Sequence, residues 1–95
     1  MFKVGITGHR PERIKNKRKE VENWLDSQIK NLKSCYGNIV LLDGMAEGVD
    51  QLAAVIGLKN GAEVNCYFPY KRKLSDVDEY IVENAAGVSY ECEKF

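Results

Sequence analysis

The sequence lacks the features of membrane, secreted and metal-binding proteins. No apolar run approaches the roughly 20 residues that a membrane-spanning helix needs. The start, MFKVGITGHR, has too short an apolar stretch for a secretory signal. The three cysteines (Cys35, Cys66 and Cys92) form no Cys-x-x-Cys pair, and none has metal-ligand spacing to the single histidine. We therefore expect a cytoplasmic protein with no membrane association, disulfide framework, metal or cofactor.

The sequence also lacks net charge, but its charges are unevenly placed. Residues 10–19 hold six basic side chains and one acidic one, whereas residues 75–95 hold six acidic side chains and one basic one. The basic run is either a solvated helix face or a positive rim beside an anionic ligand. Because no basic groove studded with aromatic residues is present, we do not expect nucleic acid as a partner.

The 95 residues suffice for one domain, which we assign to residues 1–95. Hydrophobic periodicity and glycine or proline breaks predict strands alternating with amphipathic helices. This alternation predicts an α/β fold, a Rossmann-like three-layer sandwich with a mainly parallel sheet of about four strands in the order β-α-β-α-β-α-β. The predicted strands cover 2–7, 39–42, 62–68 and 86–92, and the predicted helices cover 16–33, 49–59 and 75–84.

Side-chain chemistry adds detail to these helices. Trp24 recurs at helical spacing with Leu25 and Ile29, so we expect it to anchor the core. In the last helix Ser75 is the expected N-cap, and Asp78 stands at the capping-box position. Val77, Tyr80 and Ile81 of that helix are expected to face inward.

Two glycine-marked turns follow the first two predicted strands, at residues 7–11 and 43–50. Ligands bind at the carboxyl ends of parallel strands, so if these strands are the central pair, both turns face one crevice. Glycine permits close backbone approach, and a helix N-terminus attracts anions. The candidate ligand-binding residues are Thr7, Gly8, His9, Arg10, Gly44, Ala46, Glu47, Gly48 and Asp50.

Several of these residues have more than one interpretation. His9 either contacts the ligand, ties down its loop or acts as an acid–base group. Glu47 is a ribose acceptor, a general base or a solvent-exposed side chain, and Asp50 is either a loop brace or a ligand contact. Arg10 offers a bidentate fork for phosphate. Neither Gly-x-Gly-x-x-Gly nor a Walker lysine motif is present.

The two turns together resemble one known group. The segments Ile6-Thr7-Gly8-His9-Arg10-Pro11 and Gly44-Met45-Ala46-Glu47-Gly48-Val49-Asp50-Gln51-Leu52-Ala53 are similar to the SLOG superfamily of Rossmann-like domains. That superfamily is named for the DNA-processing protein A (Smf) and the Lonely Guy enzymes. The nearest branch holds the bacterial and phage proteins similar to YpsA and YoqJ. The resemblance adds Met45 to the candidate binding residues.

The resemblance implies binding of a nucleotide, a nucleotide derivative or, in one branch, single-stranded DNA. Relatives often have Ser where Asp43 stands, and they carry a second glycine-rich segment that is absent here, as is the Lonely Guy signature. The chain therefore resembles a short or truncated member. Its half-sheet would leave an exposed edge, from which we expect a homo-oligomer.

From this sequence we predict binding of a nucleotide or an ADP-ribose-like or phosphorylated derivative at the ends of the first two strands. The residues leave open whether the protein is an enzyme. One alternative is a hydrolase of a nucleotide N-glycosidic or phosphate bond, with Glu47 or His9 as the catalytic group. Another is a phage or bacterial adaptor that binds a protein or single-stranded DNA.

Overall fold

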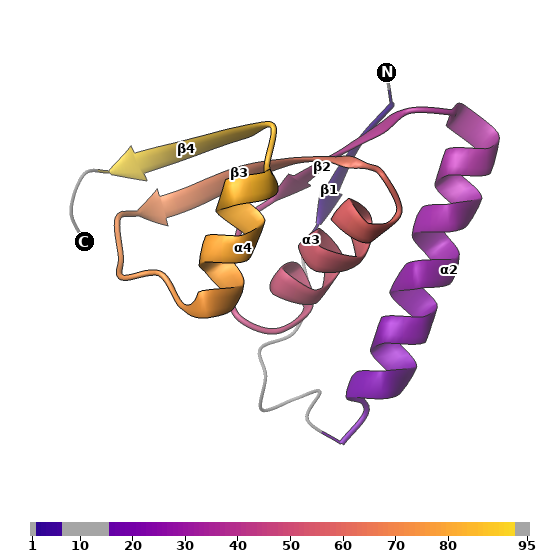
Figure 1. Ribbon diagram of the computed structural model, residues 1–95, viewed down its shortest axis with the longest axis horizontal. Coiled ribbons are helices and arrows are strands. Elements are labelled where there is room, and N and C mark those ends of the chain that lie inside the picture. The colour runs from indigo at the N-terminus through magenta and orange to yellow at the C-terminus, as the bar shows by residue number, and fades with distance from the viewer. Residues whose placement is uncertain (1, 7–15, 93–95) are drawn as a thin grey trace.

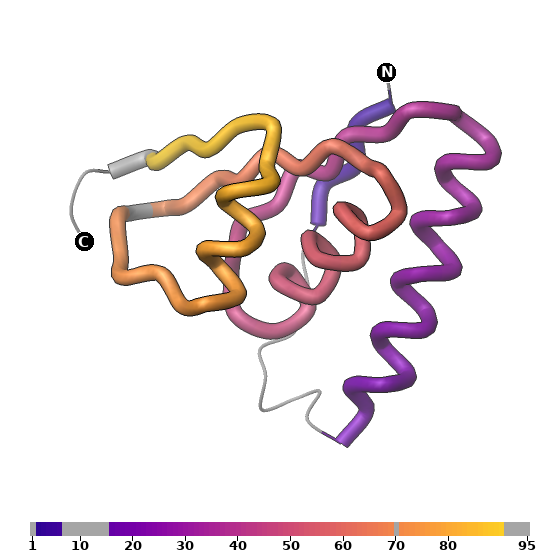
Figure 2. The backbone as a smooth tube through the Cα atoms, viewed as in Figure 1, coloured from indigo at the N-terminus to yellow at the C-terminus, as the bar shows by residue number. Residues whose placement is uncertain are grey.

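The computed structural model describes residues 2–6 and 16–92 (Figures 1 and 2). Within them, strands and helices alternate as predicted, and each element begins and ends within three residues of its expected bounds. The elements are β1 (Phe2–Ile6), α2 (Arg18–Tyr36), β2 (Ile39–Asp43), α3 (Val49–Lys59), β3 (Glu63–Tyr70), α4 (Asp76–Asn84) and β4 (Gly87–Cys92).

The four strands form one parallel sheet in the order β1-β2-β3-β4. The predicted α/β class and parallel sheet are therefore confirmed. The condition set above, that the first two strands are the central pair, is not met in this sheet, in which β2 and β3 are central and β1 lies at an edge. Each strand is added beside the previous one, so strand order does not reverse between β1 and β4.

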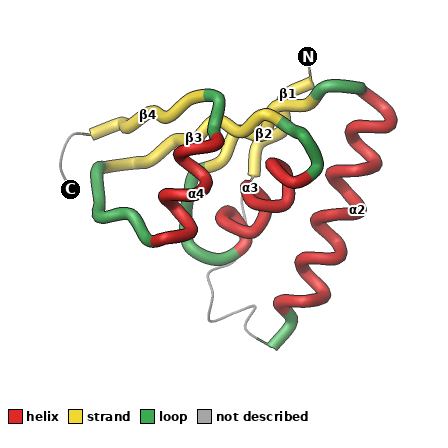
Figure 3. Tube along the Cα trace, viewed as in Figure 1, coloured by secondary structure: helices red, strands yellow, loops and turns green. Residues whose placement is uncertain are grey.

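The helices cover one face of the sheet (Figure 3). Val4, Leu41 and Val64 lie in register on adjacent strands. They belong to one hydrophobic cluster that also contains Ile29 of α2 and Ile81 of α4. Sequential parallel strands joined by right-handed crossovers place their helices on the same side. The described residues thus form one sheet layer and one helix layer, and the third layer expected of a sandwich is not among them.

The helix ends follow the residue chemistry. Ser75 Oγ accepts a hydrogen bond from Asp78 N at 3.2 Å, and Asp78 Oδ2 accepts one from Ser75 N at 3.1 Å, which confirms the capping box. Gly37, with φ of 74°, ends α2, and Gly61, with φ of 79°, follows the C-cap of α3. Glycine is favoured at such left-handed positions because it has no Cβ.

Strand β3 runs past Pro69, although the sequence predicts that it ends at Phe68. Strand β2 ends opposite Cys66, so beyond that residue β3 has only β4 beside it. Proline lacks an amide hydrogen and is tolerated where one strand edge is unpaired.

Helix α2 faces the core with Leu25 and Ile29, while Trp24 is 61% exposed. The expectation that Trp24 anchors the core is wrong, and so is the expected inward position of Val77 and Tyr80 in α4, both of which are exposed. Neighbouring helical residues point about 100° apart, so Trp24 lies off the stripe that contains Leu25. Hydrophobic spacing alone does not distinguish the stripe from its flank.

Gly57 of α3 provides a test of this packing. A Cβ on Gly57 would overlap Cδ1 of Leu41, which is fully buried, as is the neighbouring Val64. We expect Gly57→Ala to lower the free energy of unfolding by about 1–3 kcal/mol through overpacking. We expect this loss even though alanine is more favourable than glycine in a helix by about 1 kcal/mol. Urea unfolding measures the change.

Gly5→Ala is the matched control, because a Cβ on Gly5 meets nothing within 4 Å. We expect it to change the free energy of unfolding by no more than about 1 kcal/mol. A Gly57→Ala variant as stable as the parent would contradict the close packing of α3 on β2.

Candidate functional site

The candidate site lies at the carboxyl ends of the strands. Ile6, the last residue of β1, is paired in register with Asp43, the last residue of β2. The carboxyl ends of these two strands therefore lie side by side. The first turn, with the candidates Thr7, Gly8, His9 and Arg10, lies outside the described residues. The second turn is described completely and forms the basis of the site.

Two carboxylates brace this second turn from inside. Asp43 Oδ1 accepts a hydrogen bond from Met45 N at 2.9 Å, and Asp50 Oδ2 accepts one from Ala46 N at 3.3 Å. Asp50 also lies close to Gly44, where a Cβ would come within 3.3 Å of Asp50 Oδ2. The turn is thus held in one conformation, and the amides of Met45 and Ala46 are already used within the chain.

Met45 adopts a φ of 59°, and its side chain is buried in the main hydrophobic cluster. It contributes packing to the site rather than an exposed contact. Ala46 and Glu47 are exposed at the tip of the turn. Gly48, with φ of 96°, then forms the N-cap of α3.

Among the described residues, no side chain caps the first turn of α3. Gly48 supplies no side-chain cap, and the first intrahelical bond is Leu52 N to Gly48 O, at 3.1 Å. The amides of Val49, Asp50 and Gln51 therefore have no acceptor within the helix. Such amides, together with the positive end of the helix dipole, attract anions.

The two bracing carboxyl groups are buried, Asp43 completely and Asp50 to 6% exposure. Burial raises the pKa of Asp43 to about 7; the hydrogen bond from Met45 N opposes this rise, and the charge of Asp50 adds to it. Burial also raises the pKa of Asp50, against the hydrogen bond from Ala46 N. Within the described part of the chain, Asp43 Oδ2 and Asp50 Oδ1 have no hydrogen-bond partner. Ionisation of these groups therefore opposes folding.

Arg72, in the loop after β3, holds the turn from its other side. Its Nη2 donates to Met45 O at 2.7 Å, and its Nη1 donates to Asp78 Oδ2 at 2.7 Å. The guanidinium lies over the Phe68 ring, 5.1 Å from its centroid. Gln51 Nε2 also donates to Asp78, at 3.0 Å. One arginine therefore connects the glycine turn, β3 and the start of α4.

Arg72 is not among the candidate residues named from the sequence, in which it stands within the basic run Lys71-Arg72-Lys73. The three cations look alike in sequence, but Lys71 lies 5.9 Å from the centroid of the Tyr90 ring and Lys73 is exposed. No signal in the sequence pointed to Arg72, because the burial of Asp78, which favours a cationic partner, is visible only in the fold.

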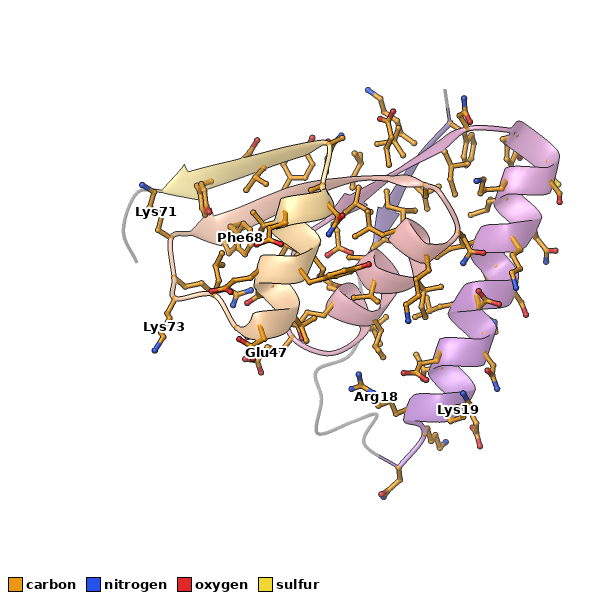
Figure 4. All side chains as sticks on the ribbon, in the orientation of Figure 1. Arg18, Lys19, Glu47, Phe68, Lys71 and Lys73 are labelled. Atoms are coloured by element: carbon orange, nitrogen blue, oxygen red, sulfur yellow. The ribbon has the colours of Figure 1, made fainter. Side chains whose placement is uncertain are left out.

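A cleft of about 510 Å³ runs between α2 and α3. Its walls include apolar residues of α3, namely Leu52, Val55 and Ile56. At one end it reaches Gly48 at the start of α3 and Arg18 at the start of α2. Figure 4 shows the Arg18 side chain directed toward α3 and that of Lys19 directed away. The cleft thus has an apolar wall, and the end at the start of the two helices holds Arg18 together with its ion-pair partner Glu22.

Arg18 also lies 3.4 Å from Glu22, one turn along α2, in an exposed ion pair. In the part of the chain that the structure describes, no three His, Cys, Asp or Glu side chains are arranged to hold a metal ion. Over the same residues, no helix is long and apolar enough to cross a membrane. No protein-family model matches the chain, and no curated protein matches it either.

Proposed function

We propose that this chain binds a nucleotide or a nucleotide-derived ligand, such as an ADP-ribose-like molecule, with a phosphate at the first turn of α3. The observation that carries the proposal is the uncapped N-terminus of α3, which lies at one end of the 510 Å³ cleft. The amides of Val49, Asp50 and Gln51 lack acceptors within the helix, and a phosphate oxygen can accept from them.

The cleft suits the remainder of such a ligand. Its volume lies within the range of about 300–1,000 Å³ typical of small-molecule sites. Leu52, Val55 and Ile56 offer an apolar surface for a base, and Arg18 offers a cation for phosphate. The resemblance of the two turns to the SLOG superfamily supports the same class of ligand. His9 and Arg10 lie outside the described residues and stay sequence-based candidates for contact with the same ligand.

Titration calorimetry with ADP, ADP-ribose and cyclic dinucleotides tests the proposal. Arg18→Ala is expected to weaken binding about tenfold, the effect of losing one charged hydrogen bond of about 1.5 kcal/mol. Lys19→Ala is the matched control, since it removes an adjacent cation that does not line the cleft. We expect the control to bind within about twofold of the parent, because exposed distant charges are screened.

Absence of binding at millimolar concentrations of every ligand, with the protein folded, would refute the proposal. Equal weakening by the two substitutions would place the ligand outside the cleft. Chromatography of the same mixtures after incubation separates binding from turnover. Product formation that is lost in Glu47→Gln would assign this exposed side chain a catalytic role.

A further inference from the structure

The single tryptophan of the chain lies on the surface, on the outer flank of α2. Asp26 accepts a hydrogen bond from Asn60 at the end of α3, which identifies the side of α2 that faces α3. Trp24 lies about 160° around the helix from Asp26 and so points away from α3. Gln28, which is also exposed, shares this side of the helix. We call these two residues the Trp24 flank.

The Trp24 flank lies on the β1 side of the molecule. Figure 1 shows α2 as the outermost helix, with no described element beyond it. Strand β1 pairs with β2 along one edge, and no described segment pairs with its other edge. The strand FKVGI contains no proline, and its one charged residue is Lys3. Of the usual devices that prevent an edge strand from pairing with another chain, it therefore carries a single lysine and no proline.

A second copy of the same strand fits this edge. In an antiparallel β1–β1 pair centred on Val4, Phe2 lies opposite Ile6 of the partner subunit. Lys3 lies opposite Gly5 of the partner subunit, so no like charges meet. A two-fold axis perpendicular to the sheet keeps the helices of both copies on one face. The two α2 helices then lie side by side, and the two Trp24 flanks face each other.

The opposite end of the sheet does not suit self-association. There α4 exposes Asp76, Glu79 and Glu83, and it contains no basic residue. Two copies of this helix would bring like charges together, which is destabilising. The exposed residues around Trp24 carry no such excess of one sign.

We propose that the outer edge of β1 and the Trp24 flank form a self-association surface, through which two copies of this chain pair as a symmetric dimer with one continuous sheet. This surface is separate from the nucleotide cleft, which lies on the α3 side of α2. Its test contains no nucleotide and is independent of the proposed function.

Sedimentation equilibrium of the chain over micromolar to millimolar concentrations gives its oligomeric state. We expect a dimer, and we expect Trp24→Glu to raise its dissociation constant about 30-fold or more, as for a buried aromatic at an interface centre. Tyr80→Glu is the matched control, since Tyr80 is an exposed aromatic of α4. We expect Tyr80→Glu to leave the dimer intact, and circular dichroism checks that both variants are folded.

Fluorescence of the parent chain provides a second measurement that needs no substitution. Because Trp24 is the only tryptophan, its emission reports on this flank alone. We expect the emission maximum to shift to shorter wavelength as the dimer forms and Trp24 leaves water. A monomer at every concentration, a dimer with unchanged emission or a dimer broken by Tyr80→Glu would each overturn the proposal.

Discussion

Replacing Arg72 by alanine is expected to lower the free energy of unfolding by about 3–5 kcal/mol, the usual cost of removing one partner of a buried ion pair. Asp78 is fully buried, and Arg72 Nη1 donates to it at 2.7 Å. The same arginine donates to Met45 O at 2.7 Å. Its loss therefore removes a partner from two groups at once. Urea unfolding at neutral pH measures the change.

The pH dependence gives this prediction a second readout. Burial raises the pKa of Asp78, but hydrogen bonds from Arg72, Gln51 and Ser75 N outweigh it, and the pKa lies below its ordinary value of 3.8. The stabilisation from ionised Asp78 is therefore present above about pH 4 and is lost as the pH falls further. We expect the difference in the free energy of unfolding between the parent and Arg72→Ala to shrink in acid, where Asp78 is protonated in both proteins.

Lys73→Ala is the control, since it removes an exposed cation of the same loop. We expect it to change the free energy of unfolding by no more than about 0.5 kcal/mol. If Arg72→Ala lowered the free energy of unfolding no more than Lys73→Ala does, the hydrogen bonds that Arg72 makes between the glycine turn and α4 would not contribute to stability.

Replacing Asp43 by asparagine is expected to remove a large pH dependence of stability. The folded-state pKa of about 7, against an ordinary value of 3.8, corresponds to about 4 kcal/mol. Because the folded-state pKa is raised, this stabilisation is fully present below about pH 4 and is lost as the pH rises through 7. Asparagine keeps an acceptor for Met45 N and cannot ionise. We therefore expect the variant to be the more stable protein at pH 8.

Thermal unfolding between pH 4 and pH 8 measures this difference. The asparagine amide needs an acceptor of its own, and an unpaired amide would offset about 1–3 kcal/mol of the gain. Asp26→Asn is the control of opposite sign: hydrogen bonds from Lys30 and Asn60 lower the pKa of Asp26, so its ionised form favours folding. If stability changed with pH in the same way in the parent and in Asp43→Asn, Asp43 would not be the group that titrates.

Local chemistry accounts for what was predicted correctly from the sequence. The reciprocal hydrogen bonds between Ser75 and Asp78 join residues only three positions apart. Periodicity of apolar residues likewise depends on short spacing. The element order, the helix bounds of α3 and the place of the glycine turn therefore follow from local sequence.

Long-range contacts account for what was missed. Arg72 and Met45 are 27 residues apart, and nothing in the run Lys71-Arg72-Lys73 distinguishes the cation that turns inward. The buried state of Asp43 and Asp50 depends on how α3 packs against β2. The exposure of Trp24 depends on which side of α2 receives a neighbour.

The sequence by itself thus determined the elements, their ends and the glycine turn between β2 and α3, since hydrogen bonding and hydrophobic spacing over a few residues decide them. The tertiary structure alone decided the strand order, the position of β1 at an edge, the cleft between α2 and α3 and the roles of Asp43, Trp24 and Arg72. These depend on which distant surfaces exclude water from one another, and burial of that kind has no signature in neighbouring residues.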